Sequence, residues 1–260
     1  MAVLRVDFFS EVLQLGTAMT VVLPERAEHR IGTATAERDG PPPVLYLLHG
    51  LSDDDGMWLR STSISRYAEE RGLAVVMPQV HRSFYTDLPG EAGRYWTFLT
   101  EELPAVVQAF FRVSERPEDT FVAGLSMGGY GALRWALAQP GRFAAAAGLS
   151  SVADLAALAA GPDRRAFFQT VLGGTTVPED ADLFHLARRV DPAAAPRLFV
   201  CCGTEDALID GNRRLADLLR SRGLDVTAEF GPGEHEWGYW DRRIQDVLAW
   251  LPLPGTPIAR

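Results

Sequence analysis

A serine lies in a glycine-rich turn at residues 124–128, where the sequence reads Gly-Leu-Ser-Met-Gly. An apolar run, 120–123, precedes the turn and an alanine-rich apolar stretch, 127–138, follows it, so Ser126 stands between an expected strand and an expected helix. Small neighbours allow the sharp turn of a nucleophile elbow, which lifts the serine out of the sheet. The start of the helix would aim backbone N–H groups at developing negative charge. The segment predicts acyl transfer through an activated serine, although the pentapeptide alone also fits an ordinary glycine-rich turn.

A serine hydroxyl needs a base within hydrogen-bond reach, usually a histidine, and the base needs an acid that fixes its tautomer. Of the five histidines, His235 alone lies late in the chain, in a glycine-rich loop directly after an apolar run. We therefore predict His235 as the base. His29 lies in a polar loop and His185 in a helical pattern, while His81 lies in an aromatic loop and is a candidate for the pocket lining.

The acid is expected just after the apolar run 197–202, where the sequence continues Gly-Thr-Glu-Asp. Asp206 is the preferred candidate, and Glu205 and Asp210 remain open alternatives because spacing alone does not decide which carboxylate turns inward. The order serine, acid, histidine along the chain is the order of the α/β-hydrolase arrangement.

The negative charge on the reacting oxygen needs two N–H donors. One is expected to be the amide of Met127, directly after the nucleophile, and the other the amide of Leu51, in the loop after an early strand. His49, in the same loop, is expected to hold the backbone rather than transfer a proton. The three consecutive aspartates 53–55 cannot all face one ion and are expected to cap the next helix, so we predict neither a metal nor a cofactor.

The elements that must position these residues alternate between strands and helices. Strands are expected at residues 3–9, 17–23, 44–48, 73–77, 120–123, 143–149, 197–202 and 224–230, and helices at 63–71, 94–112, 127–138, 211–222 and 237–250. Pro104 should bend or break the helix at 94–112. This alternation predicts an α/β fold with a mainly parallel central sheet and helices on both faces. Reacting groups in such a sheet lie beyond the carboxyl ends of its strands.

The length of 260 residues suits a single domain. Residues 151–190 interrupt the alternation with short helical patterns and are expected to form a small cap-like insertion. Residues 25–43 are polar and rich in proline, which indicates a surface loop, and residues 79–93 form a loop rich in aromatic side chains.

The composition excludes several other functions. The net charge is −9, which disfavours nucleic acid and anionic membranes as partners. All positive side chains are arginine, so no lysine base is available. The adjacent Cys201 and Cys202 point to opposite faces of a strand and are expected to stay unbridged. With no secretory signal and no long apolar stretch, we expect a soluble cytoplasmic protein.

The chain resembles the esterase D group of α/β-hydrolases, and is most similar to its bacterial tributyrin-esterase or acetyl-esterase branch. The resemblance spans about residues 45–240 and is carried by 47–52 (Leu-Leu-His-Gly-Leu-Ser), 75–78, 85–87, 101–104, 124–132 (Gly-Leu-Ser-Met-Gly-Gly-Tyr-Gly-Ala), 203–206 and 233–237 (Gly-Glu-His-Glu-Trp). It implies Ser126, Asp206 and His235 as the catalytic residues and Leu51 and Met127 as the oxyanion donors.

The resemblance also implies a small-molecule ester with a short acyl group as substrate, and in many members a homo-oligomer. Large rings around the site should favour acetyl to butyryl groups, and the candidates for the pocket are Trp58, His81, Phe84, Tyr85, Trp96 and Trp237. Two alternatives remain, a thioesterase like the S-formylglutathione hydrolases and an acyltransferase that passes the acyl group to an alcohol. Formylglutathione hydrolases usually carry a cysteine shortly after the His-Gly-Leu motif, where this chain has Ser52 and aspartates.

Overall fold

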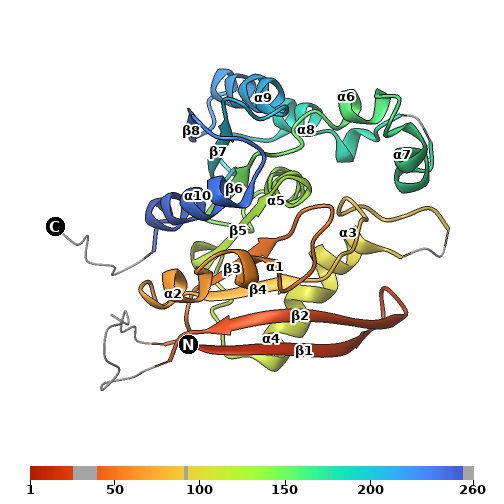
Figure 1. The fold of residues 1–260 in the computed structure, drawn as a ribbon. Helices are drawn as coiled ribbons and strands as arrows, with labels where there is room; N and C mark the ends of the chain where they lie inside the picture. Colours follow the sequence, from red (N-terminus) through yellow and green to blue (C-terminus); the bar gives the residue numbers. More distant parts are fainter. Residues whose placement is uncertain (26–39, 91–92, 175, 254–260) are drawn as a thin grey trace.

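The computed structural model describes residues 1–25, 40–90, 93–174 and 176–253. Eight strands form one sheet in the order β1-β2-β4-β3-β5-β6-β7-β8 (Figure 1). The strands are β1 (Ala2–Ser10), β2 (Leu15–Leu23), β3 (Val44–Leu48), β4 (Ala74–Pro78), β5 (Thr120–Leu125), β6 (Ala145–Leu149), β7 (Arg197–Gly203) and β8 (Val226–Gly231). The sheet is antiparallel from β1 through β2 to β4 and parallel from there onwards. Most of the polar loop expected at 25–43, with His29, lies outside the described residues.

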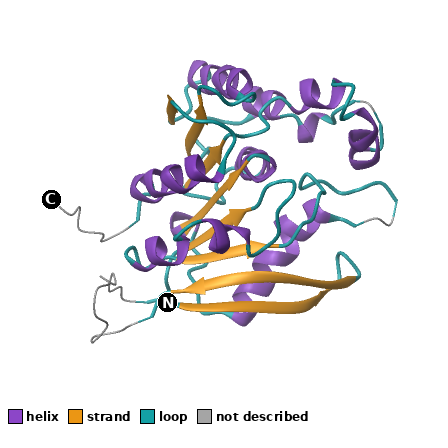
Figure 2. Cartoon of the chain, in the orientation of Figure 1, coloured by secondary structure: helices purple, strands orange, loops and turns teal. Residues whose placement is uncertain are grey.

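The helices follow the strands in alternation, as the sequence predicts, and lie on both sides of the sheet (Figure 2). They are α1 (Met57–Ser61), α2 (Ile64–Glu69), α3 (Tyr95–Thr97), α4 (Leu103–Phe110), α5 (Met127–Ala138), α6 (Leu155–Ala160), α7 (Arg165–Leu172), α8 (Leu183–Arg189), α9 (Ile209–Ser221) and α10 (Trp237–Trp250), with a π-helical turn η1 (Phe98–Glu102) and two 3₁₀ turns, η2 (Pro117–Asp119) and η3 (Glu179–Ala181).

The helix expected at 94–112 is divided into α3, η1 and α4. Pro104 lies in the first turn of α4, and its missing N–H removes a bond to the preceding turn, which is the π-helical one. The regular helix ends at Phe110, two residues earlier than expected, because Phe111 is extended. The short helix α1 was not predicted.

Two hydrophobic cores lie on opposite faces of the sheet, because successive residues of each strand alternate in direction. Tyr46 and Leu48 of β3 belong to the core shared with α4, α5, α8 and α9. Leu45 and Leu47 of the same strand belong to the core shared with α1, α2 and α10. The strands β3 to β7 are therefore buried on both faces, and this double burial fixes the part of the sheet that carries Ser126 and Asp206.

The segment between β6 and β7 contains α6, α7, η3 and α8. It is attached to the rest of the protein through α5, since the Tyr130 hydroxyl donates to the Ala181 carbonyl at 2.7 Å and the Arg134 guanidinium donates to the Asp180 carbonyl at 3.0 Å. Aromatic rings join α7 to the loop after β4, with Phe84 and Phe168 centroids 4.8 Å apart. Figure 1 shows α7 beside that loop.

Candidate active site

Ser126 occupies the turn between β5 and α5 with a backbone conformation that few residues adopt, φ 54° and ψ −115°. Such strain persists only where the surroundings enforce it. The neighbours must be glycine, since a Cβ on Gly128 would overlap the backbone carbonyls of Leu48 and His49 and one on Gly124 would overlap Gly128. The sequence therefore folds here into the sharp turn expected of a nucleophile elbow.

Ser126, His235 and Asp206 form a continuous hydrogen-bonded chain although they lie far apart in the sequence. The Ser126 Oγ is 3.1 Å from His235 Nε2, and His235 Nδ1 is 2.8 Å from Asp206 Oδ2. Because the ionised carboxylate accepts only, the Nδ1–H donates to it, which leaves Nε2 free to accept the serine proton. The three residues follow β5, β7 and β8, whose carboxyl ends meet at one edge of the sheet.

The Asp206 side chain is fully buried, whereas that of His235 is 39% exposed. Burial acts to raise the pKa of Asp206, but the hydrogen bonds from His235 and from the Leu208 amide (2.9 Å) outweigh it and hold this pKa below its usual value. The carboxylate is therefore ionised at neutral pH and can stabilise a positive charge on the imidazole.

The other two carboxylates that the sequence left open serve elsewhere. Glu205 accepts a hydrogen bond from the Gly233 amide at 2.6 Å, so it holds the loop that carries His235 rather than contacting the imidazole. That amide lowers the pKa of Glu205. Asp210 is 86% exposed and lies 4.0 Å from Arg213 on α9.

Two backbone amides are available for a negatively charged oxygen. Met127 opens α5, and a first-turn N–H has no acceptor within its own helix. The amide of Leu51 takes part in no hydrogen bond among the described residues. The neighbouring Gly50 amide is bound by Asp53 Oδ2 at 3.0 Å, which fixes the loop at this point.

The His49 side chain holds the backbone of the loop that contains Gly50 and Leu51, as the sequence predicts. Its Nδ1–H donates to the Gly50 carbonyl at 2.7 Å, and its Nε2 accepts from the Val80 amide at 3.2 Å. Burial lowers the pKa of His49, so the ring is neutral at pH 7. The Tyr85 hydroxyl donates to the His49 carbonyl at 2.9 Å.

A buried amide that the sequence analysis did not single out lies behind the triad. Asn212 of α9 is fully buried; its Oδ1 accepts from the Ser151 amide at 3.2 Å, and its Nδ2 donates to the carbonyls of Ser151 at 2.8 Å and Leu208 at 2.9 Å. A sequence signal existed, because Asn212 shares the buried face of its helix with Leu215 and Leu219.

The two segments that Asn212 joins each support one member of the triad. The Ser126 carbonyl accepts from the Val152 amide at 3.2 Å, and the Ser126 amide donates to the Leu149 carbonyl at 2.9 Å, so residues 149–152 hold Ser126 in place. The Leu208 amide holds Asp206, as described above. The side chain of Asn212 thus links the segment that holds Ser126 to the segment that holds Asp206.

The aromatic side chains expected around the pocket lie in three places. Trp58 is buried, donates to the Leu48 carbonyl at 3.1 Å and packs edge-on against the half-buried Trp237, with centroids 5.3 Å apart. Trp237 in turn contacts Trp240, whose ring is 4.8 Å from that of His235. These rings connect α1 and α10 beside His235.

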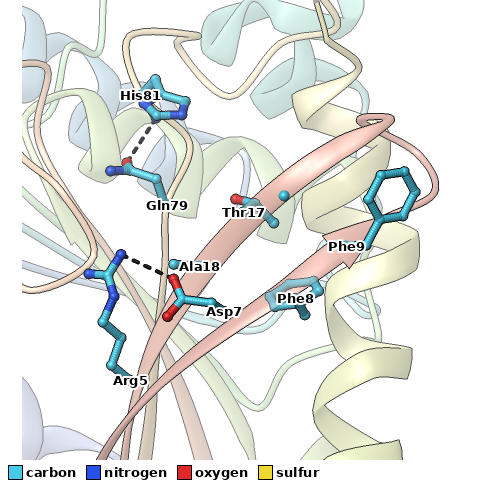
Figure 3. A pocket seen from close by; sticks show the side chains of 9 residues that line it. Arg5, Asp7, Phe8, Phe9, Thr17, Ala18, Gln79 and His81 are labelled. Atoms are coloured by element: carbon cyan, nitrogen blue, oxygen red, sulfur yellow. Dashed lines mark hydrogen bonds and ion pairs between the residues drawn. The ribbon is translucent and has the colours of Figure 1, made fainter.

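The remaining pocket candidates lie on the loop after β4 and on α3. Phe84 and Tyr85 are buried against the neighbouring helices, and the ring of Trp96 is covered by the Arg134 guanidinium at 3.9 Å. His81 lines an open groove of about 620 Å³ whose lining includes neither Ser126 nor His235 (Figure 3). Their role as pocket walls stays a prediction.

The three consecutive aspartates diverge, as expected, but the prediction that they cap the next helix is wrong, since α1 begins after Gly56 and α2 after Ser63, both without a side-chain cap. Asp53 binds the Gly50 amide, Asp54 pairs with Arg60 at 2.6 Å, and the buried Asp55 accepts from the Thr20 hydroxyl at 2.6 Å. None of the helices in the described part of the chain combines the length and apolar character that a bilayer crossing needs.

Comparisons with known proteins agree with this geometry. A family model described as "Putative esterase" matches residues 10–251. An acetyl esterase of Caldicellulosiruptor saccharolyticus is 28% identical over 262 residues, which is 96% of this chain and 98% of the relative. The solved structure of FphF, a fluorophosphonate-binding serine hydrolase of Staphylococcus aureus, is 31% identical with a TM-score of 0.84. That of FrmB, an S-formylglutathione hydrolase of the same organism, is 32% identical with a TM-score of 0.83. Each structural match covers 96% of this chain and 98% of the other.

Proposed function

This chain belongs to the esterase family whose model spans residues 10–251, and we propose that it hydrolyses esters of short acyl chains, from acetyl to butyryl, through Ser126, His235 and Asp206. The observation that carries the proposal is the hydrogen-bonded chain from the Ser126 hydroxyl through His235 to the buried Asp206 carboxylate. The enzyme is a serine hydrolase acting on carboxylic esters, so these residues would supply its nucleophile, base and acid.

In the first half of the reaction the Ser126 Oγ attacks the ester carbonyl while His235 Nε2 takes the hydroxyl proton. The amides of Leu51 and Met127 would donate to the oxyanion of the tetrahedral intermediate, and losing one such donor typically costs on the order of 10²–10³ in rate. His235 then gives its proton to the departing alcohol oxygen, and an acyl-serine remains. Asp206 holds the Nδ1–H throughout and stabilises the imidazolium without taking its proton.

In the second half a water molecule replaces the alcohol. His235 removes a proton from the water, the hydroxyl oxygen adds to the acyl carbon, and the Ser126 oxygen leaves with the proton that His235 returns. The exposure of the His235 side chain supports this step, because water and leaving alcohol both need access to Nε2.

The proposed preference for short acyl groups rests on the aromatic rings near His235. Trp240 lies against His235, Trp237 against Trp240 and Trp58 against Trp237, and such large rings close to the base would leave room for short acyl chains. The acetyl esterase of C. saccharolyticus supports the same choice. A series of 4-nitrophenyl esters from acetyl to decanoyl tests it: kcat/KM should be highest between acetyl and butyryl, and a maximum at long chains would refute the proposal.

A thioester is the second candidate, favoured by the similarity to the S-formylglutathione hydrolase FrmB. The same acyl-serine chemistry cleaves a thioester, with a thiol as leaving group in place of the alcohol. Hydrolysis of S-formylglutathione with a higher kcat/KM than 4-nitrophenyl acetate would favour this candidate, and absence of that activity would leave the carboxylic ester as the substrate class.

A further inference from the structure

Tyr85 has a backbone conformation that a bulky side chain rarely adopts. Its φ is 52°, in the left-handed region that favours glycine, and the residue is fully buried in the loop after β4. A conformation of this kind is costly and persists only where the surrounding structure holds it. The contacts that hold Tyr85 lead to α5 on one side and to the loop between β3 and α1 on the other.

The attachment of Tyr85 to α5 consists of close packing and a charged hydrogen bond. A Cβ on Gly131 would lie 2.6 Å from the Tyr85 ring, so the ring rests directly on the backbone of the helix. The buried guanidinium of Arg134, three residues further along α5, donates to the Tyr85 carbonyl at 2.8 Å. Both the ring and the backbone of Tyr85 are thus fixed to the helix that begins at Met127.

The hydroxyl of Tyr85 is attached to the loop after β3. It donates to the His49 carbonyl at 2.9 Å, and this buried residue's carbonyl accepts no other hydrogen bond among the described residues. The amide of Leu51 follows two residues later in the same loop. Burial raises the pKa of Tyr85 well above its usual value, so the hydroxyl stays protonated and can donate at neutral pH.

The two amides available for the oxyanion belong to different elements, that of Met127 to α5 and that of Leu51 to the loop after β3. We propose that Tyr85 is a positioning residue that sets the distance between these two amides, because it is attached to both elements at once. This role of Tyr85 rests on the proposed function, in which both amides bind the same oxygen. Oxyanion donors act at about 2.7–3.1 Å from the charged oxygen, so a shift of one element against the other weakens at least one of the two bonds.

Tyr85→Phe tests this role, because it removes the bond to the His49 carbonyl and keeps the ring on Gly131. A displacement of about 1 Å typically costs about 10²-fold, so kcat should fall about 10- to 100-fold with little change in KM. A trifluoromethyl ketone adds to the catalytic serine as a tetrahedral oxyanion, and its inhibition constant should rise by the factor by which kcat/KM falls. Titration with a fluorophosphonate counts the active sites, so unfolded chains do not enter kcat.

Tyr130→Phe is the matched control, because it loses a hydrogen bond of the same kind that does not involve the oxyanion loop. Tyr130 is also fully buried, and its hydroxyl donates to the Ala181 carbonyl at 2.7 Å. Tyr130→Phe should lose similar thermal stability but keep kcat and the inhibition constant within a few-fold of the wild type.

Three results would overturn the role of Tyr85 while leaving the proposed function intact. They are wild-type values in Tyr85→Phe, equal losses in Tyr85→Phe and Tyr130→Phe, and a lower kcat of Tyr85→Phe without weaker inhibition by the ketone. A wild-type chain that hydrolyses no ester would instead overturn the proposed function, and the role of Tyr85 with it.

Discussion

Asn212→Ala is expected to damage the active site without touching any of its reacting atoms. The substitution removes three hydrogen bonds and leaves the buried amide of Ser151 without a partner, while the carbonyls of Ser151 and Leu208 keep the bonds that they accept from the backbone amides of Ala153 and of residue 212. An unsatisfied buried polar group costs about 1–3 kcal/mol, so the free energy of unfolding should fall by about 1–3 kcal/mol. Residues 149–152 and the turn after Asp206 would then lose their common anchor.

The loss of activity follows from a displacement of Ser126 or Asp206, because the segments that hold these two residues are no longer joined. A displacement of about 1 Å in a catalytic group typically costs about 10²-fold, so kcat/KM of Asn212→Ala should fall about 10- to 100-fold while KM changes little. The loss should lie in acylation, which the rate of labelling by a fluorophosphonate measures directly. Both measurements are made at a temperature where the variant is fully folded, as its urea unfolding curve establishes.

Leu219→Ala is the matched control for Asn212→Ala. Leu219 lies on the same buried face of α9, and its replacement by alanine should lower the free energy of unfolding by about 2–5 kcal/mol. The apolar side chain of Leu219 makes no hydrogen bond to the segments that hold Ser126 and Asp206. Leu219→Ala should therefore keep kcat/KM within a few-fold of the wild type. Equal losses of activity in both variants would refute the positioning role of Asn212, as would wild-type activity in Asn212→Ala.

Three further predictions concern the acid, the elbow and the oxyanion loop. Asp206→Asn should lower kcat by about 10⁴, because an amide no longer fixes the tautomer of His235, and a loss below tenfold would argue against Asp206 as the acid. Gly128→Ala should prevent stable folding, because its Cβ overlaps two backbone carbonyls, and a wild-type melting temperature would contradict the described turn. Burial holds the pKa of His49 below 6.5, so the unfolded chain takes up that proton first as the pH falls, and the free energy of unfolding should decrease below pH 6.5. His49→Gln should lack this part of the decrease in urea titrations, and an unchanged pH dependence would contradict it.

The edge of the sheet at which the site lies could be predicted, because the order of strands and loops along the chain determines it. Ser126 and Asp206 follow the buried strands β5 and β7, and His235 follows the partly buried outermost strand β8. Parallel strands have their carboxyl ends at the same edge of the sheet. The choice between neighbouring candidate residues could not be predicted, because it depends on the backbone conformation of a single turn. Whether Glu205 or Asp206 faces the imidazole depends on the backbone after β7, where Glu205 turns to the Gly233 amide instead.

Other features depend on tertiary contacts that no local pattern reports. The aromatic residues of the loop after β4 look alike in sequence, yet Phe84 and Tyr85 are buried against helices while His81 faces an open groove. The π-helical turn before Pro104 arises from one missing donor within an otherwise regular helical pattern. In the sequence Asn212 is one polar residue of an amphipathic helix, and only the structure shows that it binds Ser151 and Leu208.

The central claim is that the Ser126 hydroxyl is the nucleophile. Intact-mass spectrometry after treatment with a fluorophosphonate tests it directly, with Ser221→Ala as a control for an exposed serine away from the site. The wild type and Ser221→Ala should each gain one phosphonyl group, and Ser126→Ala should gain none and lose ester hydrolysis. Labelling of Ser126→Ala at the wild-type rate would contradict the account.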